Sequence, residues 1–128
     1  MHTVMRFVGN GSEDDVNLRA CGAMLNDIIP GLYEGINLVR EHGFSCSLCM
    51  ANDWPSHHQS IMEICTNLRP LLDTAKRAGL HVEIDCAIHY EDHCRVPVNS
   101  LGCQPELLRI LADCNTWLVI SIYGGGME

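Results

Sequence analysis

The residues of this chain best suited to chemistry are its thiols and imidazoles. Cys46 and Cys49 form a C-x-x-C pair, a spacing used by redox thiols and by half of a structural zinc site. A zinc site needs a second closely spaced Cys or His pair, and the nearest set, His89, His93 and Cys94, lacks a standard spacing. A redox pair would begin a helix, whereas this pair falls inside a strand pattern. We therefore expect neither a metal site nor a cofactor.

Histidines and carboxylates offer a second route to catalysis. The chain has 7 histidines, including the adjacent His57 and His58, but no zinc-protease or deaminase motif accompanies them. Glu83 and Asp85 lie two residues apart on one strand, so they point the same way and could act as paired carboxylates. An exposed polar sheet face explains the same spacing. We expect no catalytic residues, and an enzyme dependent on metal or thiol chemistry in the His- and Cys-rich segments stays as an alternative.

Charge and hydropathy narrow the classes of partner. The chain of 128 residues carries 16 acidic and 8 basic side chains, a net charge of −8. Phosphate binding needs clustered Lys and Arg, so nucleic acid is an unfavourable partner, whereas a basic protein is a favourable one. No apolar run is long enough to span a bilayer, so we expect no membrane partner. The first residues lack a secretory signal, which predicts a cytoplasmic protein with reduced cysteines.

Hydrophobic periodicity in the first half predicts a strand, a helix and a hairpin. The strand covers residues 3–8 and ends at a Gly-Asn-Gly turn. Ser12 is the expected N-cap of a helix that ends before Pro30, with an apolar stripe of Val16, Ala20, Met24 and Ile28. The apolar runs 32–39 and 44–50 predict a β-hairpin. In its second run, the residues expected to face the core are Phe44, Cys46, Leu48 and Met50.

The second half predicts two helices and two strands. Residues 56–79 carry apolar residues at helical spacing, with a capping box of Ser56 and Gln59, and Pro70 predicts a kink or break near 67–69. Residues 82–88 alternate as a strand, and a loop follows over 90–102. Pro105 opens a short helix. The closing strand has Leu118, Ile120 and Ile122 on its core side.

These elements predict an α+β fold in the order β-α-β-β-α-β-α-β. A single domain over residues 1–128 would hold one mixed or antiparallel sheet, with its helices packed on one face. The other face must then meet solvent or a partner. If the strands over 82–88 and 118–122 are neighbours, that second face carries Glu83, Asp85, Trp117 and Tyr123. Aromatic side chains beside acidic ones are typical of protein-binding surfaces, so we predict partner binding there. The same aromatics would also suit a strand edge or a homodimer.

Residues 52–124 resemble an uncharacterised bacterial family of stand-alone α+β domains of unknown function, some of which are similar to immunity proteins of polymorphic toxins. The segments that carry the resemblance are 61–64 (IMEI), 68–72 (LRPLL), 82–85 (VEID), 106–112 (ELLRILA) and 119–123 (VISIY). The first half departs from the family because the usual Gly-x-Pro-Thr type segment after the first helix is absent. The resemblance implies a small acidic protein that neutralises a toxin or effector by direct binding. It implies no catalytic residues.

Overall fold

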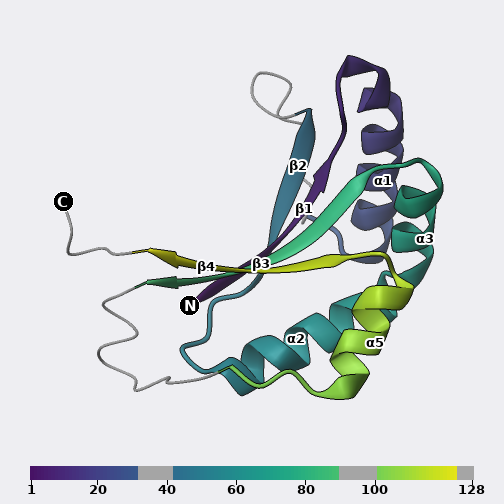
Figure 1. Cartoon of the computed structure of the whole chain (residues 1–128). Coiled ribbons are helices and arrows are strands. Elements are labelled where there is room, and N and C mark those ends of the chain that lie inside the picture. Colours follow the sequence, from purple (N-terminus) through teal and green to yellow (C-terminus); the bar gives the residue numbers. More distant parts are fainter. Residues whose placement is uncertain (32–41, 90–100, 124–128) are drawn as a thin grey trace.

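Four strands form one mixed sheet in the computed structural model, which describes residues 1–31, 42–89 and 101–123. The strands are β1 (His2–Val8), β2 (Gly43–Cys49), β3 (His81–His89) and β4 (Trp117–Tyr123). Their order in the sheet is β2-β1-β3-β4 (Figure 1). β1 runs antiparallel to both β2 and β3, whereas β4 runs parallel to β3. The predicted α+β class with one mixed sheet is confirmed.

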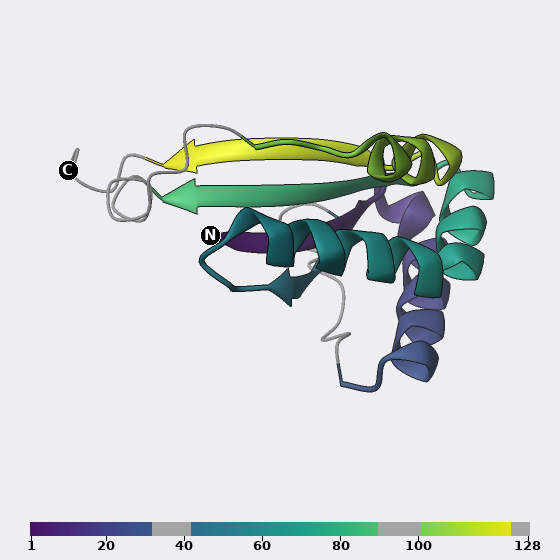
Figure 2. The same ribbon diagram turned by 90° about the horizontal axis from the view of Figure 1, so that it is seen from below.

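The four α-helices of the described chain cover one face of this sheet (Figure 2). They are α1 (Asp15–Ile28), α2 (Trp54–Asn67), α3 (Arg69–Arg77) and α5 (Pro105–Asp113), and a short 3-10 helix, η1 (Ser12–Asp14), precedes α1. None of these helices is both long enough and apolar enough to cross a membrane. The other sheet face, called the open face below, carries no described helix.

Alternation along the central strands separates the two sheet faces. On β1 the buried side chains are Thr3, Met5 and Phe7, while the side chains between them are only half-buried. β3 repeats the pattern with Val82, Ile84, Cys86 and Ile88 buried on the helix side. Apolar side chains on one face and mixed ones on the other are the pattern of a sheet covered on one side. The core therefore lies between the sheet and the helices.

A break at Leu68 divides the predicted helix of residues 56–79 into α2 and α3. Pro70 lies in the first turn of α3, where its missing N–H would have had no helical partner anyway. The predicted capping box is wrong, because α2 begins at Trp54 and its cap is Asp53, whose carboxylate accepts a 2.9 Å hydrogen bond from the Ser56 amide. Gly79, at a φ of 73°, ends α3 in the left-handed region as expected.

Helix α1 buries a different stripe from the predicted one. Val16 and Ile28 are 74% and 40% exposed, whereas the buried residues are Leu18, Cys21, Gly22 and Leu25. Both rows have helical spacing, and the buried row offers two leucines to the core. Ser12 belongs to η1 and makes no side-chain cap bond to α1.

Two expectations about the hairpin region have different outcomes. Phe44 and Cys46 are buried and Leu48 packs against the core, but Met50 follows the end of β2 and is 72% exposed. The expected strand at 32–39 lies outside the described residues, as do residues 90–100 of the loop expected over 90–102; the last two residues of that loop form no helix or strand. Within the described chain, β2 is paired with β1 instead.

The closing strand β4 is an edge strand that its helices cover incompletely. Leu118 packs against the core as expected. Ile120 and Ile122 share its face, because they pair with the buried Cys86 and Ile88, yet they are 41% and 74% exposed. Both therefore lie on the expected side of the sheet but are not buried, because the described helices do not extend over the far end of β4.

Candidate functional site: the open sheet face

The four residues predicted to bind a partner lie together on the open face. Glu83 is opposite Trp117, and His89 is opposite Tyr123, in the parallel register of β3 and β4. Residues opposite each other on neighbouring strands project from the same face. Asp85 projects beside Glu83, because the two are separated by one residue of β3. The condition that the two strands are neighbours is therefore met.

These four side chains differ in how far they reach solvent. Trp117 is 63% exposed and Tyr123 is 49% exposed, whereas Asp85 is only 5% exposed. Each aromatic ring contacts a histidine of β3: His81 meets Trp117 edge-on and His89 stacks on Tyr123, both with ring centroids 5.5 Å apart. The aromatic ends of the face are thus presented to solvent, and the carboxylate at its centre is not.

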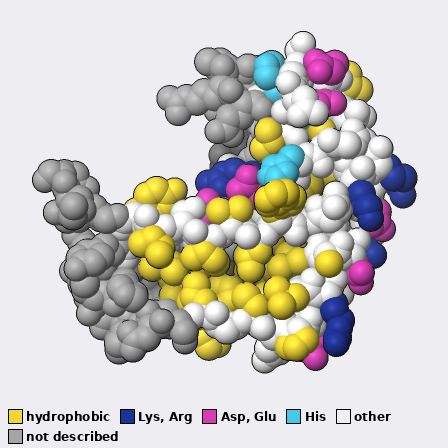
Figure 3. Space-filling model, in the orientation of Figure 1, with side chains coloured by type: hydrophobic (Ala, Val, Ile, Leu, Met, Phe, Trp, Pro, Cys, Tyr) yellow, Lys and Arg dark blue, Asp and Glu magenta, His cyan; other side chains and the backbone are white. Residues whose placement is uncertain are grey.

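Arg6 of β1, which was not among the predicted site residues, lies at the centre of this face. Its Nη1 donates a 2.8 Å hydrogen bond to Asp85 Oδ2 and lies 3.6 Å from Glu83 Oε2. His81 Nε2 is 3.2 Å from the other Glu83 oxygen. Figure 3 shows this cluster above β4 as adjoining blue, magenta and cyan side chains. The sequence signal for Arg6 was the alternation along β1. Met5 and Phe7 point to the core, so Arg6, between them, points to the other face of the sheet.

The cluster changes the electrostatics expected for the face. Two carboxylates and one guanidinium leave it with one net negative charge while the histidines are neutral. Asp85 is committed to Arg6, so its charge is partly compensated within the protein. Glu83 is the carboxylate of this pair that still reaches solvent, with a side chain 21% exposed.

The C-x-x-C pair lies on the helix side of the sheet rather than in a reactive site. Cys46 pairs with Met5, and a register shift between Thr3 and Val4 lets Cys49 pair with Thr3. Thr3 and Met5 are both buried on the helix side of β1, so both cysteines lie on that side as well. Burial raises the pKa of the Cys46 thiol from 9.0 to about 11. Metal ligation and redox attack both need a thiolate, which this shift disfavours. No group of three or more metal-binding side chains occurs in the described part of the chain, and His93 and Cys94 fall outside that part.

His57 is a hydrogen-bonded residue of the core. It is fully buried, and its Nε2 lies 2.5 Å from the Ala51 carbonyl oxygen while its Nδ1 lies 2.6 Å from Thr3 Oγ1. A carbonyl oxygen only accepts, so Nε2 carries the proton and Nδ1 accepts from the Thr3 hydroxyl. Both ring nitrogens are occupied, which leaves His57 no lone pair or proton for a substrate.

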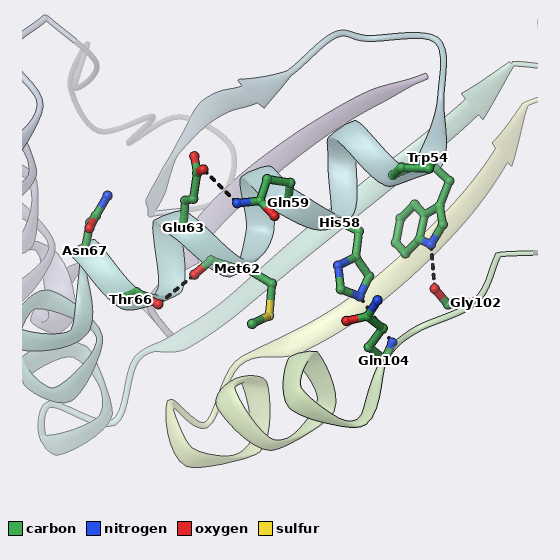
Figure 4. Close-up of a pocket in the computed structure, with 10 residues that line it drawn as sticks. Trp54, His58, Gln59, Met62, Glu63, Thr66, Asn67, Gly102 and Gln104 are labelled. Atoms are coloured by element: carbon green, nitrogen blue, oxygen red, sulfur yellow. Dashed lines mark hydrogen bonds between the residues drawn. The ribbon is translucent and has the colours of Figure 1, made fainter.

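A pocket of about 560 Å³ opens beside α2 (Figure 4). Its wall joins one side of α2 to the segment before α5, through a 2.7 Å hydrogen bond from Trp54 Nε1 to the Gly102 carbonyl oxygen. His58 Nε2 accepts a 3.2 Å hydrogen bond from the backbone N–H of Gln104. The lining residues are Trp54, Pro55, His58, Gln59, Met62, Glu63, Thr66, Asn67, Gly102 and Gln104. The ionisable side chains in this set are His58 and Glu63, and Glu63 accepts from Gln59.

Comparison of the chain with protein-family models, with curated proteins and with solved structures found no match. Among its described surfaces, the open face is the one where exposed aromatic rings and charged groups meet.

Proposed function

We propose that this protein is a small cytoplasmic binding protein that neutralises a basic toxin or effector by direct contact through the open face. The observation that supports this proposal most is the pair of exposed aromatic side chains, Trp117 and Tyr123, on the same face as Glu83 and Asp85. Large aromatic residues supply most of the binding energy of many protein interfaces. The resemblance of residues 52–124 to immunity-like domains favours the same role.

The four residues take different parts in the proposed contact. Trp117 and Tyr123 are the anchors, because their rings are presented to solvent and are oriented by His81 and His89. Glu83 offers a solvent-accessible carboxylate to a Lys or Arg of the partner. Asp85 positions Arg6 and acts through it, since its own carboxylate is buried.

The net charge of −8 supports a basic partner. Complementary charge accelerates the encounter of two proteins, and the acceleration falls as salt is added. The aromatic anchors act after the encounter, by slowing dissociation. The proposal therefore assigns association rate to the overall charge and to Glu83, and dissociation rate to Trp117 and Tyr123.

The test uses the protein encoded by the neighbouring gene in the source genome as the binding partner. Calorimetric titration should give a defined stoichiometry, and co-expression should relieve any toxicity of that partner. Trp117→Ala and Tyr123→Ala should each weaken binding by about 30-fold or more, which corresponds to about 2 kcal/mol. Glu83→Gln should mainly lower the association rate at low salt.

Val16→Ala is the matched control, because Val16 is an apolar residue of α1 that is 74% exposed on the helix side of the molecule. It should leave the affinity unchanged. If both aromatic variants fold and bind as tightly as the unmodified protein, the open face is not the binding surface. If the neighbouring protein does not bind at all, the proposed pairing with it fails.

A further inference from the structure

Strand β4 is an edge of the sheet that lacks the usual protection against pairing. Within the described residues its one strand neighbour is β3, and both views place it at the outer edge of the sheet (Figures 1 and 2). Its seven residues, Trp117–Tyr123, include no charged residue, no proline and no glycine. Natural edge strands are normally protected by charged side chains, by proline, by a bulge or by a covering element. A free, regular edge of this kind exposes unpaired backbone donors and acceptors.

Apolar side chains flank this edge on both faces of the sheet. On the open face Trp117 and Tyr123 are 63% and 49% exposed, and on the helix side Ile120 and Ile122 are 41% and 74% exposed. Figure 3 shows hydrophobic side chains along β4 and in the hollow between β4 and helices α2 and α5. The opposite edge, β2, instead exposes Ser45 and Ser47. The unprotected apolar edge is therefore β4 and not β2.

The residue types of β4 are nearly symmetric about Ile120. Trp117 and Tyr123 stand three positions away on either side, and both are aromatic. Leu118 and Ile122 stand two positions away, and both are aliphatic. Such a sequence is complementary to itself when two copies run antiparallel around a twofold axis through its centre.

We propose that a second copy of this chain pairs with the protein through β4, antiparallel and centred on Ile120. The pairing joins the two sheets into one of eight strands. Trp117 of each copy lies opposite the second copy's Tyr123, Leu118 lies opposite the second copy's Ile122, and the two Ile120 side chains meet on the axis. Cross-strand aromatic and aliphatic pairs of this kind stabilise antiparallel sheets.

The charge distribution permits this contact despite the overall charge. β4 brings no like charges opposite each other, because it has none. The nearest carboxylates on the open face, Glu83 and Asp85, are held by Arg6 of the same chain. The remaining net charge of −8 per copy repels at long range, and salt screens that repulsion. The dimer should therefore strengthen as ionic strength rises.

The area available matches a modest dimer. The exposed parts of Trp117, Tyr123, Ile120 and Ile122 amount to roughly 400 Å² per copy, judged from their exposed fractions and the size of such side chains. A standard interface buries about 800 Å² per partner. The backbone of β4 and the residues beside it must supply the rest, so the expected dimer is reversible and depends on concentration. Because the dimer uses Trp117 and Tyr123, which are also the proposed anchors for a basic partner, that partner should bind the monomer and dissociate the dimer.

The test measures the mass of the full chain in solution by sedimentation or light scattering. The protein should reach twice its monomer mass of 14.2 kDa as its concentration rises. Ile120→Lys and Ile120→Glu each place like charges opposite each other at the axis, and each should weaken the dimer by on the order of 100-fold. An equal mixture of the two variants should dimerise again, because Lys then faces Glu. Leu108→Lys, on a residue of α5 that is 52% exposed, is the control that should remain dimeric.

A cysteine variant tests the register without adding a charge. In the proposed pairing the two Ile120 Cα atoms are about 5 Å apart, a distance that a disulfide can bridge. Ile120→Cys should therefore form a disulfide-linked dimer on mild oxidation, whereas Ile122→Cys should not, since its two copies are offset by four positions.

The proposal is overturned if the unmodified protein stays monomeric at high concentration and high salt. It is also overturned if Ile120→Lys remains dimeric, if the Lys and Glu variants fail to pair, or if Ile122→Cys crosslinks better than Ile120→Cys.

Discussion

Arg6 of β1 and Asp85 of β3 join the two central strands through a 2.8 Å hydrogen bond on the open face of the sheet. Asp85 pairs with Val4 in the strand register, so Arg6 reaches diagonally across the strands to its carboxylate. The Asp85 side chain is 7% exposed and that of Arg6 is 32% exposed. Because this pair is partly shielded from water, removing one partner leaves the other charge poorly compensated, which costs more than the loss of an ordinary surface ion pair.

Breaking this pair should destabilise the fold. Asp85→Asn removes the carboxylate that accepts the 2.8 Å hydrogen bond of Arg6 and leaves the guanidinium only Glu83, 3.6 Å away, so we expect a loss of about 2 kcal/mol in the free energy of unfolding. Arg6→Met should cost a similar amount, because it leaves the buried Asp85 carboxylate without its donor. Chemical denaturation of both single variants and of the double variant measures the coupling.

The double variant decides how the two side chains act. If the pair works as a unit, Arg6→Met with Asp85→Asn should cost less than the sum of the two single changes. A strictly additive result would mean that the two residues contribute independently. Arg69 and Asp73 form the matched control, since they are an exposed i,i+4 pair on α3 whose loss should cost much less than that of the Arg6–Asp85 pair.

The sequence predicted much of the fold because its strongest signals are local. Pro70 located the break between α2 and α3, and Gly79 located the end of α3. The alternation of residues 82–88 assigned both faces of β3 correctly. Each of these signals depends on backbone chemistry or on burial of a whole face, and tertiary packing did not override them.

What the sequence could not predict depends on contacts between distant elements. The buried stripe of α1 depends on which side of that helix meets the sheet, and two apolar rows competed for that side. Ile120 and Ile122 have the expected orientation, but their exposure depends on where α5 ends relative to β4. Arg6 and Asp85 are 79 positions apart in the chain, so the centre of the open face was visible only in the assembled sheet.

The hydrogen bond from Trp54 Nε1 to the Gly102 carbonyl oxygen should hold residues 101–104 against α2. Trp54→Phe keeps a ring in this buried position and removes the donor, so we expect a loss of about 1 kcal/mol in the free energy of unfolding. Hydrogen exchange at the backbone N–H of Gln104 should also become faster, because that group donates to His58 in the wall of the pocket beside α2. Trp117→Phe, at an exposed position, should change neither quantity measurably.

The bond between Thr3 and His57 offers a test in which polarity and hydrophobicity predict opposite results. Thr3→Val is nearly isosteric and more apolar, so burial alone predicts a gain in stability. It leaves Nδ1 of the buried His57 without a donor, which should cost about 1–3 kcal/mol. Thr3→Ser keeps the hydroxyl and loses one methyl group, worth about 0.8 kcal/mol. Thermal melting should rank Val as the more damaging change, and the reverse order would mean that the hydrogen bond does not hold His57 in place.

The buried thiols should make the protein less stable at alkaline pH. Burial raises the pKa of Cys21 and Cys46 from 9.0 to about 11, and that of Cys65 from 9.0 to about 12. The unfolded chain loses these protons from about pH 9 while the folded chain keeps them to about pH 11, so stability is full below pH 9 and falls above it. Cys65→Ala should lower stability at neutral pH and make that fall shallower. Ile84→Val, a core change without a titrating group, should lower stability equally at every pH, and an unchanged slope for Cys65→Ala would contradict the assignment to the thiol.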